Sequence, residues 1–186
     1  IIQQQLQLPN KAFSYLRSHG SLDIEHLSFL METISSSNKI ALQGVQEDIL
    51  RIASLLLDFS FQKNYLLESE RRNVISKVSS LSKGLSMNGL DFVIRGSIST
   101  VSSPRITLQL LDDHQSSLLG RTIESHGSML TLPSQPLVQS SLDLQVVFII
   151  YSYNLYQFHA PQSDILSGTY SVLFFDQNGE ELSVNN

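Results

Sequence analysis

The stretch Leu142-Asp-Leu-Gln-Val-Val-Phe-Ile-Ile-Tyr151 decides the fold of this chain. Every second residue from Leu142 to Ile150 is apolar, which is the period of a strand whose alternate side chains share one face. The fully apolar run inside it, Val146 to Ile150, is far shorter than the roughly 20 residues that a membrane-crossing helix needs. We therefore predict a β-strand here, and any membrane anchor is expected outside these residues.

The sequence that follows predicts another strand and a hairpin. Tyr170-Ser-Val-Leu-Phe-Phe175 is rich in the aromatic and β-branched residues that favour strands. Asn178-Gly179 then separates it from the shorter segment Leu182-Ser-Val184. Because Asn and Gly both tolerate positive φ, this pair predicts a tight turn between two antiparallel strands.

Upstream, the strand period extends back to about residue 92. Phe92-Val-Ile94 predicts a short strand, and Ile106, Leu108 and Leu110 occupy alternate positions of a longer one. The serine-rich segment 97–103 predicts a turn between them. Breakers then recur at the short intervals typical of an antiparallel sheet or sandwich. They are Gly120, Gly127, Pro133, Pro136, Pro161 and Gly168.

The first half of the chain has the helical period instead. From Ser21 to about Leu85, apolar residues recur three and four positions apart, which predicts three amphipathic helices. Their apolar positions are Leu27, Leu30, Met31 and Ile34, then Val45, Ile49, Ile52, Ala53 and Leu56, then Leu67, Val74, Ile75, Val78, Leu81 and Leu85. Gly84 and Gly89 indicate where the last helix ends.

Helices followed by strands predict an α+β fold, because an α/β chain would alternate the two. The change of period places a boundary near residue 90. We expect a helical subdomain at 1–90 and an antiparallel β-sandwich-like subdomain at 91–186, packed against each other.

Composition excludes some functions. The chain has 186 residues, 41% of them hydrophobic, so it can bury a substantial core. Its net charge is -5 and it has no basic block, which argues against a nucleic-acid partner. Cysteine is absent, so there are no disulfides, and the redox compartment stays open. The lack of Asn-x-Ser/Thr sequons leans mildly against a secreted protein, and the missing initiator Met suggests an excised piece.

No constellation of side chains points to chemistry. Neither a glycine-rich phosphate loop nor a Gly-x-Ser-x-Gly elbow is present. The five histidines lack metal-ligand spacing; they are His19, His26, His114, His126 and His159. Asp112-Asp113 and Asp176-Gln-Asn178 are interpreted as turns rather than cation sites. The aromatic residues Tyr151, Tyr153, Tyr156 and Phe158 are expected to pack in the core or on the sheet. We therefore expect no catalytic, cofactor-binding or metal-ligating residues.

The order of the degenerate motifs resembles the GPCR-autoproteolysis-inducing (GAIN) domain across roughly residues 40–186. These motifs are Met129-Leu-Thr-Leu-Pro133, Val147-Phe-Ile-Ile-Tyr151 with Asn154-Leu-Tyr156, and Ile165-Leu-Ser167 before an apolar strand. The hairpin Phe175-Asp-Gln-Asn-Gly-Glu-Glu-Leu-Ser-Val-Asn185 looks most like the polycystin and sperm egg-jelly-receptor version. Adhesion G-protein-coupled receptors are second.

This resemblance implies a non-catalytic extracellular scaffold that cradles a C-terminal self-cleavage motif, His-Leu-Ser/Thr flanked by Cys and Trp. The motif is expected outside this segment, which is truncated before it. The implied partner is the C-terminal strand segment of the parent chain, with an extracellular ligand or a channel subunit through the parent protein. The implied location is the extracellular face of the plasma or ciliary membrane, with membrane contact only through other parts of the parent.

His26-Leu27-Ser28 also spells the tripeptide, but we interpret it as a chance match, because it falls in a predicted helix, where the regular backbone offers no strained peptide. One alternative from another class stays open, an unrelated intracellular α+β protein-interaction module, which the absence of cysteines and sequons would suit. An enzyme ranks third.

Overall fold

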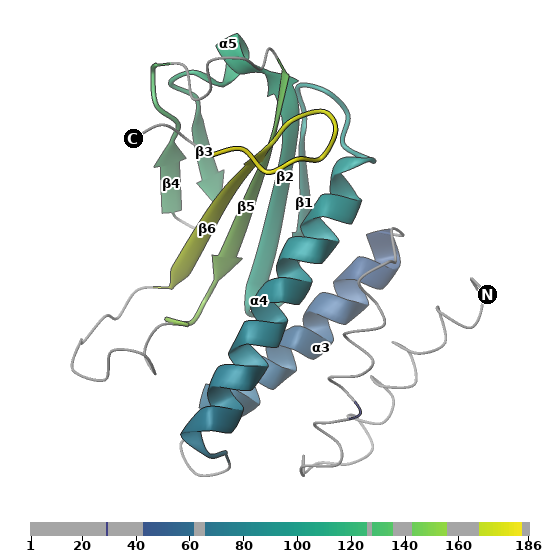
Figure 1. The fold of residues 1–186 in the computed structure, drawn as a ribbon, viewed down its shortest axis with the longest axis vertical. Coiled ribbons are helices and arrows are strands. Elements are labelled where there is room, and N and C mark those ends of the chain that lie inside the picture. The colour runs from purple at the N-terminus through teal and green to yellow at the C-terminus, as the bar shows by residue number, and fades with distance from the viewer. Residues whose placement is uncertain are drawn as a thin grey trace.

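The computed structural model describes residues 29, 43–61, 66–125, 128–135, 143–155 and 168–183. Two long helices lie side by side against one face of a four-stranded antiparallel sheet, and a two-stranded hairpin lies over the other face (Figure 1). The two long helices precede the strands along the chain. The predicted α+β fold is therefore confirmed.

Helix α3 (Gln43–Phe61) buries one stripe against its neighbours. All five positions predicted for it are buried, namely Val45, Ile49, Ile52, Ala53 and Leu56. Leu50 and Leu57 are fully buried as well, so the apolar face is wider than the predicted stripe. A wide stripe is what a helix needs when it contacts both a second helix and a sheet.

Helix α4 (Glu68–Leu90) ends at the position that Gly89 indicates. It buries Val74, Ile75, Val78, Leu81 and Leu85 as predicted. Leu67, which was assigned to the same stripe, is 71% exposed, so that assignment is wrong. The residue precedes the helix, and its backbone N–H donates to Glu70 Oε2 at 2.8 Å, which satisfies one amide that would otherwise lack a partner at the helix start.

The four-stranded sheet has the order β1-β2-β5-β6, and all neighbouring strands are antiparallel. Its members are β1 (Ile98–Ser102), β2 (Ile106–His114), β5 (Asp143–Tyr151) and β6 (Thr169–Phe175). The sequence that decides the fold is thus one of the two central strands. It pairs with β2 along the full length of both, from Ile106 opposite Tyr151 to His114 opposite Asp143.

Between β2 and β5 the chain forms the short helix α5 (Gln115–Leu118) and the hairpin β3 (Thr122–Ser125) and β4 (Ser128–Thr131). The hairpin strands pair only with each other in the described part of the chain. They form the second, smaller β-layer visible in Figure 1.

Alternation along the strands separates two apolar clusters. The inner cluster joins the helices to the sheet and includes Leu108, Leu110, Val147, Ile149 and Phe175. The outer cluster joins α5 and the hairpin to the opposite face. It consists of Leu111, Leu118, Ile123, Leu132, Leu144, Val146, Phe148 and Phe174. The sheet is therefore buried on both faces, which explains why β5 is almost continuously apolar.

Two predictions near the start of the sheet are wrong, one of a strand and one of a turn. Phe92-Val-Ile94 forms turns, because the N–H groups of Phe92 and Val93 donate back to Gly89 and Leu90 at the end of α4. The segment 97–103, predicted as a turn, instead contains β1. The only buried residue of β1 is Val101. An edge strand with one buried side chain shows almost no alternation of apolar and polar residues in its sequence.

The helical and strand portions share the inner cluster, which contains residues of α3, α4 and all four strands of the main sheet. Helix α4 ends at Leu90 and β1 begins at Ile98, but the division into two subdomains stays a prediction. The first predicted helix, around Leu27 to Ile34, lies outside the described residues apart from position 29. Within the part of the chain that the structure describes, no helix combines the length and apolar character that crossing a bilayer requires.

Candidate functional site

Strand β6 is the last strand on one side of the main sheet in the described part of the chain. Backbone groups on its outer side can therefore pair with a further strand. Strand β6 pairs with β5 from Thr169 to Phe175 on its inner side. The carbonyl of Phe174 points to the other side, where it accepts a hydrogen bond from Leu182 N at 2.8 Å. Because backbone groups alternate along a strand, the N–H and C=O of Val172 point to that same outer side.

A tight turn returns the chain to this edge. Gly179 N donates to the carbonyl of Asp176 at 3.1 Å, and Gly179 has φ of 78°, a conformation that favours glycine. The Asp176 carboxylate accepts from the backbone N–H groups of Asn178 (2.9 Å) and Glu180 (2.8 Å). The predicted turn at Asn178-Gly179 is confirmed.

The hydrogen bond from the Glu180 amide is the main cause that lowers the pKa of Asp176, with the bonds from Asn178 and Gly179 adding to it. A carboxylate that accepts several amide hydrogens is stabilised in its charged form. The ionised Asp176 side chain is thus part of the turn.

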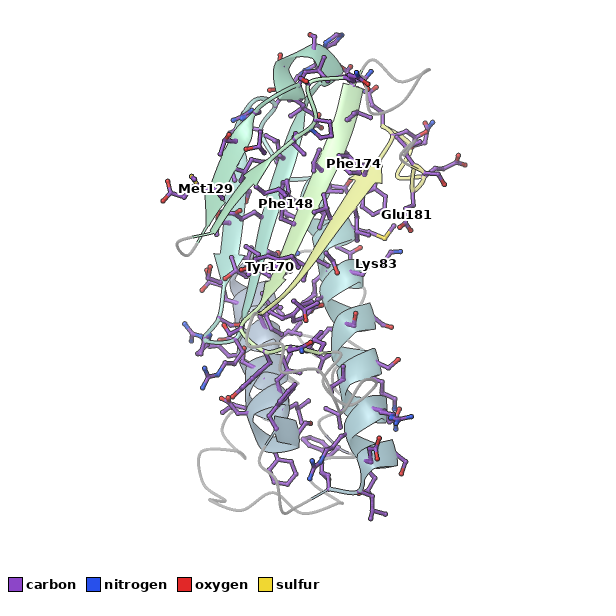
Figure 2. All side chains as sticks on the ribbon, turned by 90° about the vertical axis from the view of Figure 1, so that its left-hand side faces the viewer. Lys83, Met129, Phe148, Tyr170, Phe174 and Glu181 are labelled. Atoms are coloured by element: carbon purple, nitrogen blue, oxygen red, sulfur yellow. The ribbon has the colours of Figure 1, made fainter. Side chains whose placement is uncertain are left out.

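After the turn, residues 181 and 182 alternate like those of a strand. Glu181 faces the helices, where its Oε2 lies 2.5 Å from Lys83 Nζ of α4. Leu182 faces the other way and packs against the outer cluster beside Phe174. Together with the bridge between Phe175 and Glu181, this alternation starts a strand antiparallel to β6. Figure 2 labels Lys83, Glu181 and Phe174 at this corner.

A cavity lies on the outer face of the sheet beside the hairpin, and Figure 2 labels Met129, Phe148 and Tyr170 from its lining. The hairpin side chains in the outer cluster cover the end of the sheet near Val146 and Phe174. Toward Ile150 and Tyr170 they leave a cavity of about 470 Å³. Met129 of β4, at 76% exposed, lines its outer wall. This volume falls in the range of small-molecule sites.

A polar cluster fastens the far end of the sheet to α3. Asp58 Oδ1 accepts a hydrogen bond from Arg105 Nε at 2.7 Å and another from the hydroxyl of Tyr153. The Tyr153 ring stacks on Phe61 with centroids 4.2 Å apart. Burial raises the pKa of Tyr153, and the hydrogen bond and negative charge of Asp58 raise it further. We interpret the cluster as structural, because Arg105 and Tyr153 both direct their polar groups to the Asp58 carboxylate.

None of the candidate chemical residues that the structure describes joins another in a site. Within the described ranges, no three His, Cys, Asp or Glu side chains gather closely enough to hold a metal ion. His114 ends β2, and its Nδ1 accepts from Ser116 N at 3.2 Å, which caps α5. His19, His26, His126 and His159 lie outside the described residues, as do Leu27-Ser28, Tyr156 and Phe158.

The turn predicted at Asp112-Asp113 is wrong. Both residues belong to β2, opposite Gln145 and Leu144 of β5, because pairing with β5 continues to the end of β2 at His114. Their side chains are engaged in different contacts: Asp112 Oδ2 accepts from Gln145 Nε2 at 3.3 Å, and Asp113 Oδ2 lies 3.3 Å from Arg121 Nη1. They do not form a cation site together.

Of the four aromatic residues predicted to pack in the core or on the sheet, the two that the structure describes do so. Tyr151 is 1% exposed within the inner cluster, and Tyr153 is packed against it. The outer cavity was missed from sequence. Gln109 is the signal that could have indicated it, because a glutamine at an alternate position of an apolar strand has to face something other than core.

Comparisons with known proteins add no family. A scan against protein-family models finds none that matches this chain, and a search of curated proteins finds no match. The resemblance to GAIN domains stays a prediction.

Proposed function

We propose that this chain is the scaffold of a GAIN-like domain from a polycystin-like membrane receptor or channel protein. In this proposal it performs no catalysis. Its sheet holds a C-terminal strand of its own parent chain at the extracellular face of the membrane. An adhesion-receptor GAIN domain would use the same sheet in the same way.

The observation that supports this proposal is the outer edge of β6. The chain returns to that edge at Glu181 and Leu182, and the Val172 backbone groups point outward beyond them. An edge strand with outward backbone groups is a template for strand addition. A strand that continues after Ser183 in the same register would run along β6 toward its first residue, Thr169.

Such pairing is suited to a fragment that stays bound after backbone cleavage. Each main-chain hydrogen bond contributes about 0.5–1.5 kcal/mol net, so several of them together hold a strand without a covalent link. The same bonds break one after another when the strand is peeled away from one end. A held strand can therefore be released by force or by a competing ligand.

The test begins with the reading frame after Asn186. If the proposal is correct, it encodes a Cys- and Trp-rich segment with His-Leu-Ser/Thr within about fifty residues, a length set by a few strands of usual size. The chain extended through this motif should give two bands on a denaturing gel and one band when the motif Ser/Thr is replaced by Ala. A frame that lacks the motif contradicts the proposal and favours the intracellular interaction module.

A further inference from the structure

The cavity on the outer face has a floor made by two cross-strand rows of the main sheet. Gln109, Phe148 and Val172 form the first row on β2, β5 and β6. Ile150 and Tyr170 form part of the next. Directly opposed residues of antiparallel strands point to the same face, so these five side chains face the cavity together.

The hairpin supplies the wall. Ile123 of β3 and Met129 and Leu130 of β4 line the cavity from that side. Met129 and Leu130 are exposed large apolar residues, as is Tyr170 across the cavity. Apolar side chains that gather around a hollow, instead of lying scattered, indicate a place where something apolar binds.

The polarity of the lining restricts the ligand. No charged side chain lines the cavity, and its polar members are Gln109, Ser171 and Tyr170. A carboxylate or an ammonium group would find no counter-charge there and would lose its hydration on entering. The ligand that fits this lining is neutral.

Gln109 adds one hydrogen-bonding position. It is only 7% exposed, and within the described residues its amide makes one hydrogen bond, a long one of 3.4 Å from Nε2 to the carbonyl of Glu124. A primary amide has two donor hydrogens and an acceptor oxygen, so this side chain keeps both donor and acceptor capacity at the cavity floor. A buried amide with unused capacity is matched by a ligand hydroxyl.

We propose that this cavity binds a neutral, mainly apolar small molecule that carries one hydroxyl, such as an aliphatic alcohol. The apolar body would lie against Phe148, Val172 and Leu130, and the hydroxyl would bond the amide of Gln109. The proposal rests on the cavity alone and is independent of strand addition at the edge of β6.

The test uses the 186-residue chain with decanol and decanoate as probes. The chain has three methionines, so their methyl resonances give a small set of NMR reporters. Decanol should shift the Met129 methyl in a saturable manner and leave that of Met87, which lies on α4 and does not line this cavity, unchanged. Decanoate should bind at least tenfold more weakly, because its charge has no partner.

Variants separate specific binding from adsorption to apolar surface. Ile150→Trp should fill the cavity and abolish the Met129 shift. Gln109→Leu should weaken decanol binding by about three- to tenfold, the value of one hydrogen bond. Ile94→Ala, at an exposed apolar position outside the cavity, is the matched control and should bind decanol like the parent.

Four results would overturn the proposal. One is equal binding of decanol and decanoate. Another is a decanol shift at Met87 that matches the shift at Met129. The third is unchanged affinity in Gln109→Leu, which needs no bulky substitution and so stays informative if Ile150→Trp fails to fold. A concentration-dependent dimer that protects the Met129 methyl would also overturn it, since a second copy would then be the occupant.

Discussion

Lys83 on α4 and Glu181 after the return turn are 98 residues apart in sequence, yet their charged groups lie 2.5 Å apart. The contact joins the helical layer to the segment that follows β6. It also fixes which way Glu181 points, and therefore sends Leu182 to the opposite face. The exposed ion pair between Lys83 and Glu181 is therefore compatible with only one register of the segment that returns along β6.

We expect this ion pair to contribute little to global stability. The two side chains are 41% and 47% exposed, so a double-mutant cycle with Lys83→Ala and Glu181→Ala should give a coupling free energy of about 0.2–1 kcal/mol. The coupling should shrink in molar salt, because screening acts strongly on exposed charges. A salt-independent coupling of several kcal/mol would show that the register assigned to Glu181 is wrong.

The return turn should be sensitive to acid. The pKa of Asp176 is lowered in the folded chain by amide hydrogen bonds, chiefly from Glu180. The stabilisation is therefore complete above the ordinary carboxyl pKa and is lost as pH falls through the lower folded value. Relative to the intrinsic rate at each pH, amide hydrogen exchange at Asn178 and Glu180 should accelerate in that acidic window.

Asp176→Asn should make this exchange faster at neutral pH and remove its acid dependence. The acid dependence belongs to the turn, so the amides of β2 and β5 serve as the internal control. An acid response that persists in Asp176→Asn would assign it to another carboxylate.

Neighbouring leucines of α3 should differ sharply in their effect on folding. Leu56 is fully buried, so Leu56→Ala should lower the free energy of unfolding by about 2–5 kcal/mol. Leu55 is exposed, and Leu55→Ala should change it by about 0.5 kcal/mol or less. Urea denaturation monitored by circular dichroism measures both, and similar values for the two would mean that the helix faces the sheet with another side.

Proline substitutions should distinguish the two sides of β6. By alternation, the N–H of Ser171 points to β5 and that of Val172 points to the outer edge. Ser171→Pro removes a ladder hydrogen bond and leaves an acceptor on β5 unpaired, so it should cost about 1–3 kcal/mol more than Val172→Pro.

Val172→Pro should keep the fold but weaken the hold on an added strand. In the extended, cleaved protein, we expect the C-terminal fragment to dissociate from this variant under milder denaturant than from the parent. Equal retention by both would place the strand somewhere other than the edge of β6.

Strongly periodic segments were predictable from sequence. The stripes of α3 and α4 and the alternation in β5 are direct consequences of burial, so each leaves an apolar residue wherever the element touches its neighbours. The turn at Asn178-Gly179 was predictable for a different reason, since only a few residues accept its backbone conformation.

The errors occur where burial leaves no periodic trace. The polar edge strand β1 was predicted as a turn, and the apolar triplet at Phe92 was predicted as a strand although it caps the end of α4. The cavity beside Gln109 depends on how far the hairpin reaches over the sheet. That distance follows from packing between segments that are separate in sequence, and no local pattern encodes it.

The two edges of the main sheet are chemically unequal. Strand β1 is short and exposes Ser and Thr side chains, with Val101 as its one buried residue, whereas β6 presents a longer, largely apolar run. Joining β6 of one copy to β1 of the next would be needed for an endless stack, and the polar edge disfavours that union. If β6 of one copy pairs with β6 of a second copy, neither copy has an apolar edge strand left for further pairing. Self-association through this sheet would therefore end at a closed pair and not continue into a fibre.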